Sequence, residues 1–279
     1  MKQALAIVGA LVGCNQVYGL EAVLLVDAPG PDAAPSCAGT LAYRQELQQV
    51  ILQACEHYTS AADIDRALAS CNRGARRYIA EGPIDGVLQE VAVEVTAAGA
   101  ALLTRLAPEG DRAIIHHLGT SGTDKFSVYR REPAGWMRAY ALPAVVDYDD
   151  SIGTPSRRPN ARVLHARPNA GLVDEYVEEP ADTWRWLRSY TTTELGTISL
   201  YTQFNLTPDG LHVVYQGFLF DGTLAIYHGQ RASLDEPFGR GVAIAGIPRT
   251  VHDAFMTHDC GRIYFSGLSS VFYARQVGQ

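Results

Sequence analysis

The sequence has 279 residues, 47% hydrophobic and 9% aromatic, which is enough apolar content to bury a substantial core. Its 30 Asp and Glu residues outnumber its 23 Lys and Arg residues, its net charge is -7 at pH 7, and it has no basic run, so nucleic acid is not expected as a partner. After the first fourteen residues, no segment is long and apolar enough to cross a membrane.

The N-terminal fourteen residues predict export. Lys2 provides a positive start, residues 4–11 are apolar, and small residues lie just before Cys14. This apolar run is too short to span a bilayer and fits an export signal. The segment resembles the lipobox of bacterial lipoproteins, in which signal peptidase cuts before a cysteine that then carries lipid. The resemblance implies a signal peptide over 1–13 and a lipid anchor on Cys14, which attaches the protein to a membrane.

The resemblance also implies a location in the cell envelope, outside the cytoplasm, at the outer membrane or its periplasmic face. An ordinary secretory signal that happens to contain Cys14 is the alternative. Residues 28–36 combine three prolines with small and acidic residues, so we expect residues 14–36 to be a disordered tether. The folded domain is then expected to span residues 37–279.

Four further cysteines lie in this domain. An even number in an exported chain favours two disulfides, with three possible connectivities, and buried free thiols are the alternative. Zinc is less expected because no Cys-x-x-Cys pair occurs. The four residues are Cys37, Cys55, Cys71 and Cys260.

The rest of the chain repeats with a period near 50 residues. Short apolar runs rich in β-formers follow turn residues in the segments 110–115, 160–165, 210–215 and 261–265. A second alternating strand follows at 126–131, 224–228 and 271–275, and a third element begins on an aromatic residue at 135–136, 183–184 and 238–239. This order at this period predicts the blades of an all-β propeller.

An earlier and weaker copy of the repeat begins at Arg66 and would bring the number of blades to about five. Its strand order over 66–88 parallels that of 162–187. A competing interpretation assigns two helices to 42–80, because 43–50 contains helix-forming residues. We favour the divergent first blade.

The need to close the ring predicts which cysteines bond to each other. A propeller must join its last blade to its first, and the final copy ends at 271–276 without a third strand. We therefore expect residues just after Cys37 to add a strand to the last blade and Cys37 to bond Cys260. Cys55 and Cys71 would then link neighbouring strands of the first blade.

The last two copies resemble the repeat of TolB-like propellers over about 200–275. The likeness lies in 206–210, 213–215, 231–239 and 259–266, where the family has a tight turn between blade strands. It implies blade turns at Asp209 and Gly210, and again at Asp259 and Gly261. It also implies an exported bacterial propeller, but no reaction, because these repeats are structural.

Two His-Asp pairs, His252-Asp253 and His258-Asp259, resemble a metal cluster. Asp259 corresponds to the turn residue Asp209, so the repeat accounts for much of this pattern, and no metal or other cofactor is predicted. Three other histidines follow their strands at similar offsets and would either face an axial channel or pack structurally, the latter being favoured. They are His116, His117 and His165.

Two further groups are candidates for glycan chemistry. An acidic loop before the third copy could supply channel carboxylates, although a solvated loop is the favoured interpretation. Three tryptophans could stack on sugars, although wedging between blades is their ordinary role at this period. The residues are Asp147, Asp149, Asp150, Trp136, Trp184 and Trp186.

The sequence contains no phosphate loop, nucleophile elbow or zinc helix. We therefore expect a membrane-anchored binding or scaffolding module for an unknown protein or glycan ligand. The alternative is a secreted hydrolase that acts on glycan through carboxylates in the propeller channel.

Overall fold

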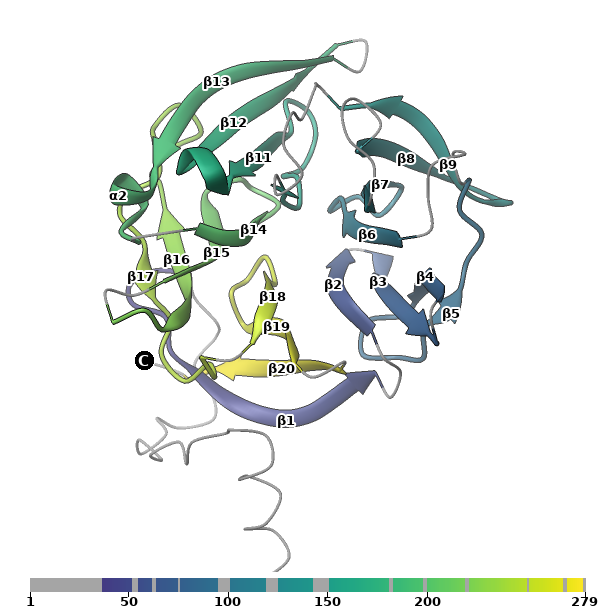
Figure 1. Cartoon of the computed structure of the whole chain (residues 1–279), viewed down its shortest axis with the longest axis horizontal. Coiled ribbons are helices and arrows are strands. Elements are labelled where there is room, and N and C mark those ends of the chain that lie inside the picture. Colours follow the sequence, from purple (N-terminus) through teal and green to yellow (C-terminus); the bar gives the residue numbers. More distant parts are fainter. Residues whose placement is uncertain are drawn as a thin grey trace, which may run out of the picture.

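The computed structural model describes residues 37–51, 55–61, 64–74, 76–94, 101–118, 125–142, 151–180, 183–197, 200–218, 221–249, 251–267 and 270–277. Within these residues, the strands form five antiparallel sheets of four strands each, arranged around a central axis (Figure 1). The chain is therefore a five-bladed β-propeller, as the repeat predicted. The predicted signal peptide and tether, including Cys14, lie outside the described residues.

Each of the first four blades runs along the chain from the strand nearest the axis to the outermost strand. Blade 1 contains β2 (Cys55–Ala61), β3 (Arg66–Arg73), β4 (Arg76–Gly82) and β5 (Gln89–Glu90). Blade 2 contains β6 (Ala101–Leu106), β7 (Arg112–Leu118), β8 (Phe126–Glu132) and β9 (Gly135–Ala141). Blade 3 contains β10 (Ser151–Ile152), β11 (Arg162–Arg167), β12 (Leu172–Glu179) and β13 (Thr183–Thr191). Blade 4 contains β14 (Leu200–Leu206), β15 (His212–Phe218), β16 (Leu224–Gln230) and β17 (Val242–Ala243).

Blade 5 is built from both ends of the described chain. Its inner strands are β18 (His252–Met256), β19 (Arg262–Gly267) and β20 (Ser270–Gln276), and β1 (Tyr43–Ile51) is its outermost strand. β1 pairs with β20 in antiparallel fashion, from Tyr43 opposite Gln276 to Ile51 opposite Val271. The predicted closure is confirmed, and the two-helix interpretation of 42–80 is wrong, because pairing in blades 5 and 1 overrides the helix propensity of this segment.

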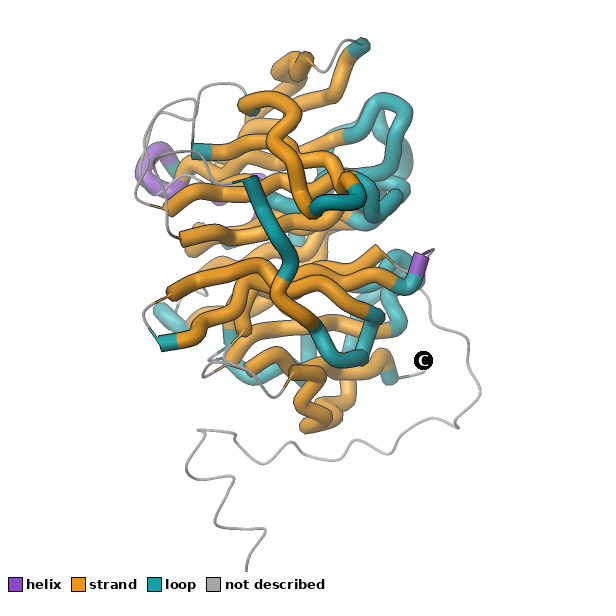
Figure 2. The backbone as a smooth tube through the Cα atoms, turned by 90° about the vertical axis from the view of Figure 1, so that its right-hand side faces the viewer, coloured by secondary structure: helices purple, strands orange, loops and turns teal. Residues whose placement is uncertain are grey.

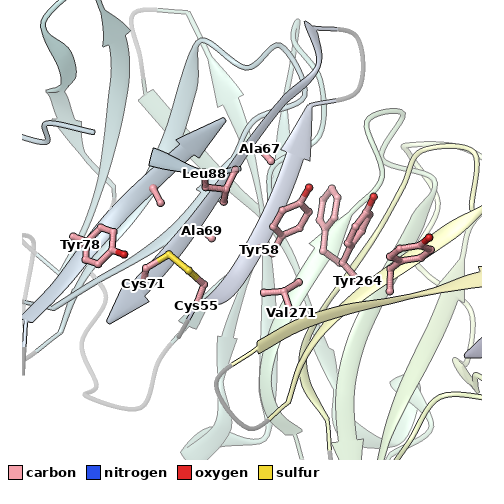
Figure 3. Close-up of a cluster of buried hydrophobic side chains, with 12 residues drawn as sticks. Cys55, Tyr58, Ala67, Ala69, Cys71, Tyr78, Leu88, Tyr264 and Val271 are labelled. Carbon is pink, nitrogen blue, oxygen red and sulfur yellow. A yellow bond between two sulfur atoms is a disulfide. The ribbon is translucent and has the colours of Figure 1, made fainter. Parts of the chain in front are cut away.

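Both predicted disulfides are present. Cys37 bonds Cys260, 223 residues away, and so attaches the segment before β1 to the turn before β19. Cys55 on β2 bonds Cys71 directly opposite on β3, and this pair belongs to the apolar cluster drawn in Figure 3.

In blades 2 to 5, the turn between the first and second strands contains one residue with a left-handed backbone, and these residues lie 50 positions apart. The residues are Gly110, Asn160, Gly210 and Cys260, with φ of 72°, 59°, 70° and 58°. Gly261 lies in the predicted turn before β19, but the left-handed position that Gly210 occupies in blade 4 is taken by Cys260 in blade 5. Asp209 and Asp259 act alike, each accepting hydrogen bonds from a threonine two residues earlier and from a backbone N–H two residues later.

One predicted third strand begins later than expected. Phe238 lies in a loop, and β17 starts only at Val242. Phe238 is buried against Tyr190 of blade 3, and the guanidinium of Arg231 lies 4.2 Å from its ring centroid. Packing between blades, rather than strand pairing, therefore explains this aromatic residue.

Apolar side chains fill the space between neighbouring blades. Figure 2 shows the backbone of the sheets from the side, with the strands of successive sheets lying beside one another. Between blades 1 and 5, the rings of Tyr58 and Tyr264 lie with centroids 4.7 Å apart (Figure 3). Between blades 1 and 2, Trp136 is fully buried and donates a hydrogen bond from Nε1 to Glu81 at 2.9 Å. Trp136 is thus a wedge between blades, whereas Trp186 on β13 is 53% exposed.

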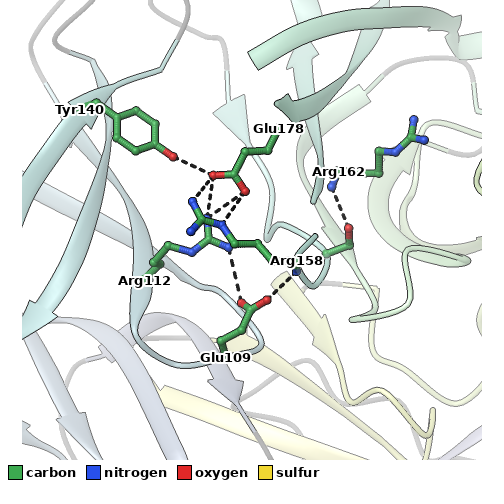
Figure 4. A network of polar contacts seen from close by, with 7 residues as sticks. Glu109, Arg112, Tyr140, Arg158, Arg162 and Glu178 are labelled. Atoms are coloured by element: carbon green, nitrogen blue, oxygen red, sulfur yellow. Dashed lines mark hydrogen bonds and ion pairs between the residues drawn. The ribbon is translucent and has the colours of Figure 1, made fainter. Parts of the chain in front are cut away.

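Ion pairs and hydrogen bonds to a buried carboxylate also hold neighbouring blades together. Glu178 of blade 3 accepts hydrogen bonds from Arg112 at 3.1 Å and Tyr140 at 3.0 Å, both in blade 2, and from Arg158 (Figure 4). Burial raises the pKa of Glu178, but the hydrogen bond from Arg158 and the charges of Arg112 and Arg158 outweigh it, so the net pKa is lowered.

Among the described residues, the short helix η3 (Pro168–Ala170) connects β11 to β12, and the short helix α2 (Thr192–Leu195) follows β13. Within the described parts of the chain, no helix has the length and apolar character needed to span a membrane.

Candidate functional site

Two bulged inner strands bring a histidine and an aspartate together beside the axis. The register of β2 shifts between Glu56 and Thr59, and that of β18 shifts between His252 and Phe255. Within these bulges His57 and Asp253 have left-handed backbones, with φ of 54° and 56°. Non-glycine residues rarely adopt this conformation, and such strained positions are concentrated at functional sites.

His57 and Asp253 form an ion pair between blades 1 and 5, with Nδ1 3.1 Å from Oδ2. Both side chains are buried, at 8% and 4% exposure. Burial raises the pKa of Asp253, but the charge and hydrogen bond of His57 outweigh it, so the net pKa is lowered. Asp253 is therefore ionised at neutral pH and positioned by His57.

A second carboxylate lies on the other side of His57. Glu56 Oε2 is 3.8 Å from His57 Nε2 and 3.6 Å from Nη2 of Arg77 on β4. The imidazole thus lies between two carboxylates, each of which also interacts with a cationic side chain. This arrangement holds the imidazole ring in place and brings two carboxylates next to one histidine.

Blade 2 contributes a buried guanidinium to the same region. Arg105 on β6 is 5% exposed and donates from Nη1 to the carbonyl of Thr104 at 2.8 Å. Its Nε has no hydrogen-bond partner among the described residues. Burial lowers the pKa of Arg105 to about 10, opposed by the charge of Asp253, so the group stays cationic at neutral pH.

Two more basic residues of blade 2 lie close by. Lys125 is 1% exposed, and His116 Nε2 is buried without a partner in the described part of the chain. Burial, together with the charges of Lys125, Arg105 and His57, lowers the pKa of His116 to about 2, so its imidazole is neutral. These charge interactions link blades 1, 2 and 5 across the axis. We call His57, Arg105, His116, Lys125 and Asp253 the axial cluster.

A small pocket lies on the axis near the other ends of the inner strands and is lined by residues of all five blades. It has hydroxyl, apolar and basic walls, including Ser60, Leu106, Thr154, Leu206, Phe255 and His258. The Cys37–Cys260 disulfide lies on this side, because the carbonyl of His258 is 3.5 Å from Cys37 Sγ.

The structure separates residues that the sequence placed together. His252-Asp253 begins β18 at the axial cluster, whereas His258-Asp259 belongs to the turn that follows β18. His165 lies in a different pocket, together with Tyr176 of the same blade. The acidic loop with Asp147, Asp149 and Asp150 lies outside the described residues.

One group of possible metal ligands occurs in the described part of the chain, formed by Cys37, His212 and Cys260. Both sulfur atoms are joined in the disulfide and are not available as thiolates.

Sequence reasoning did not single out His57, Arg105 or Lys125. His57 lies in the most divergent copy of the repeat, and Arg105 and Lys125 lie between the recognised strand anchors. Only the bulges and the closed ring bring these side chains together.

No protein-family model matches the sequence, and no curated protein matches it. Solved structures do match. The endo-arabinase from Bacteroides thetaiotaomicron VPI-5482 has a TM-score of 0.53 at 10% identity, covering 86% of this chain and 98% of that chain. The catalytic domain of the Coprinopsis cinerea GH62 alpha-L-arabinofuranosidase has a TM-score of 0.52 at 11% identity, covering 88% and 98%. The chain shares its propeller fold with glycosidases.

The periplasmic gluconolactonase from Pseudomonas aeruginosa matches at 16% identity with a TM-score of 0.46, covering 80% of this chain and 67% of that chain. At these identities the likeness shows the fold alone, because one fold supports many activities. The comparisons do not support the narrower TolB-like and lipoprotein assignments. The two disulfides suggest a location outside the cytoplasm.

Proposed function

We propose that the protein is an extracytoplasmic propeller that binds a glycan at its axial cluster. The observation that carries the proposal is the buried His57–Asp253 pair, formed by two strained, non-glycine residues on inner strands of different blades. Ligand sites combine a few well-positioned polar groups with a largely preformed frame, and this pair provides a donor and an acceptor held by the ring. The fold shared with an endo-arabinase and an arabinofuranosidase supports a glycan as the ligand.

Binding is tested by calorimetric titration of the folded protein with neutral and acidic oligosaccharides, arabinan fragments included. We expect a saccharide to bind and Asp253→Asn to weaken its affinity at least tenfold, because the carboxylate would lose its charge. Asp235→Asn is the matched control, since this exposed aspartate lies in the loop between β16 and β17 of blade 4, away from the axis. Absence of binding to every saccharide, or equal losses in both variants, would refute the proposal.

Glycan hydrolysis is the second candidate, and the two carboxylates beside His57 favour it specifically. Glycosidases use a pair of carboxyl groups as acid and base or nucleophile, and Glu56 and Asp253 are the carboxylates of the described inner strands. The test is release of reducing ends from the saccharides that bind. Activity that is lost in both Glu56→Gln and Asp253→Asn supports hydrolysis, whereas binding without turnover supports a binding module.

We also propose that Cys14 carries a lipid that anchors the propeller to an envelope membrane. The lipobox-like segment ending at Cys14 supports this, as do the disulfides. The Cys37–Cys260 bond would then attach the tether to the turn side of blade 5.

A further inference from the structure

Within the axial cluster, the buried guanidinium of Arg105 has the least compensation for its charge among the residues that the structure describes. Burying a guanidinium is costly unless a carboxylate and hydrogen bonds compensate it. Within the described residues no carboxylate lies within ion-pair distance of Arg105, and its hydrogen bond goes to the neutral carbonyl of Thr104. Among the described residues, the buried guanidinium of Arg105 therefore has no counterion.

The nearby carboxylates interact with other side chains. Asp253 pairs with His57 at 3.1 Å, and Glu56 lies 3.6 Å from Arg77. Asp253 affects Arg105 only through longer-range charge interaction. The two carboxylates of the described inner strands therefore already interact closely with other cationic side chains, and neither forms an ion pair with Arg105.

The donor geometry favours a planar or tetrahedral anion. The hydrogen bond of Arg105 uses Nη1, so the edge of the guanidinium that contains Nε is not used by the described residues. This edge of a guanidinium binds a carboxylate or a phosphate side-on. His116 adds a buried Nε2, also without a partner in the described chain, and this neutral imidazole can donate to an oxygen.

We propose that the axial cluster takes a carbohydrate with an anionic substituent, bound by Arg105 with help from His116. This inference rests on the proposed function, because it names the class of glycan that the same site binds. The anionic group is the carboxylate of a uronic acid or a phosphate ester, which present the same oxygen geometry to a guanidinium.

The experiment measures affinities for matched ligands that differ only in this group. Oligogalacturonate, its fully methyl-esterified form and a sugar phosphate are titrated into wild type, Arg105→Met, Arg105→Lys and the control Arg138→Met. Arg138 lies on the outermost strand of the same blade. Thermal unfolding of every variant is recorded in parallel.

We expect at least one anionic ligand to bind tenfold or more tightly than the neutral ester, and Arg105→Met to abolish that preference. Arg105→Lys should retain part of it, because the charge stays while the planar fork is lost. Arg138→Met should behave as wild type. A higher affinity for oligogalacturonate identifies the uronic acid, and a higher affinity for the sugar phosphate identifies the ester.

Equal affinity for charged and neutral ligands would overturn the inference while leaving glycan binding intact. Failure of every saccharide would instead overturn the proposed function. Inorganic phosphate and free galacturonate are therefore titrated separately, and if neither these nor any saccharide binds in an Arg105-dependent way, the anion site is refuted as well. A fall in melting temperature on Arg105→Met with unchanged ligand preference would identify Arg105 as structural.

Discussion

Cys37 and Cys260 are joined by a disulfide across 223 residues, with their Cα atoms 5.2 Å apart, at the place where the ring closes. Cys37 lies just before β1, and Cys260 occupies the left-handed position of the turn before β19 in the same blade. The bond therefore reinforces the pairing of β1 with β20, which is the non-covalent closure of the propeller.

The double variant Cys37→Ser/Cys260→Ser should lose about 5 kcal/mol of unfolding free energy in the chain-entropy model, because its unfolded chain is no longer cross-linked. The Cys55–Cys71 bond closes a loop of 16 residues. Its removal should cost less, about 3 kcal/mol. Urea unfolding of both double variants measures the two losses. A larger loss for the short loop would contradict the entropic explanation.

Gly210→Ala should destabilise the protein by about 1–3 kcal/mol, because a side chain is strained at this left-handed backbone. An added Cβ would also lie 2.9 Å from Leu234 Cδ2. Gly261→Ala is the matched control, since Gly261 does not have a positive φ. Equal losses in the two variants would show that the left-handed position is assigned wrongly.

Glu175→Gln should reduce stability by about 3–5 kcal/mol, because it leaves buried guanidinium groups without their carboxylate. Glu175 is fully buried, and its Oε1 lies 2.7 Å from Arg231 Nη1 between blades 3 and 4. Glu179→Gln is the control, because its ion pair with Arg185 is exposed and should contribute about 1 kcal/mol or less. Denaturant unfolding distinguishes the two, and a small effect at Glu175 would contradict the role of this pair.

Stability should fall as the pH is lowered from about 6.5 to about 4, in part because of His228. Burial and the charge of His212 lower the pKa of His228 to about 4 in the folded protein. The unfolded chain takes up this proton at a higher pH, near 6.5, so acid favours unfolding over this interval and the contribution levels off below it. In thermal unfolding, His228→Asn should flatten the decline. An unchanged pH profile would show that His228 does not contribute.

Cys14→Ser should release the protein from the membrane fraction or leave an uncleaved precursor, because the thiol that would carry the lipid is absent. Cell fractionation and mass spectrometry of the N-terminus measure both outcomes. A mature wild-type protein that begins at another residue, with an unmodified N-terminus, would refute the lipid anchor.

The sequence by itself determined the propeller, because its evidence is local and repeated. A turn residue, an apolar strand and an aromatic strand recur near every 50 residues, and each copy obeys the same rules of backbone conformation and burial. Closure and both disulfides followed once a ring was assumed. The sequence also located the turn at Asp259 and Gly261, but not its left-handed residue, because glycine usually takes that conformation and here Cys260 does.

Only the tertiary structure decided the axial cluster. His57, Arg105 and Asp253 belong to different copies of the repeat, and for each of them the residue 50 positions away in the neighbouring copy is of a different type. They meet because bulges in β2 and β18 turn two backbones into the left-handed region and because the ring brings blades 1, 2 and 5 around one axis. Local sequence patterns do not predict which side chains of different blades lie close together. The distances between these side chains depend on how the blades pack in the closed ring, and not on their spacing along the chain.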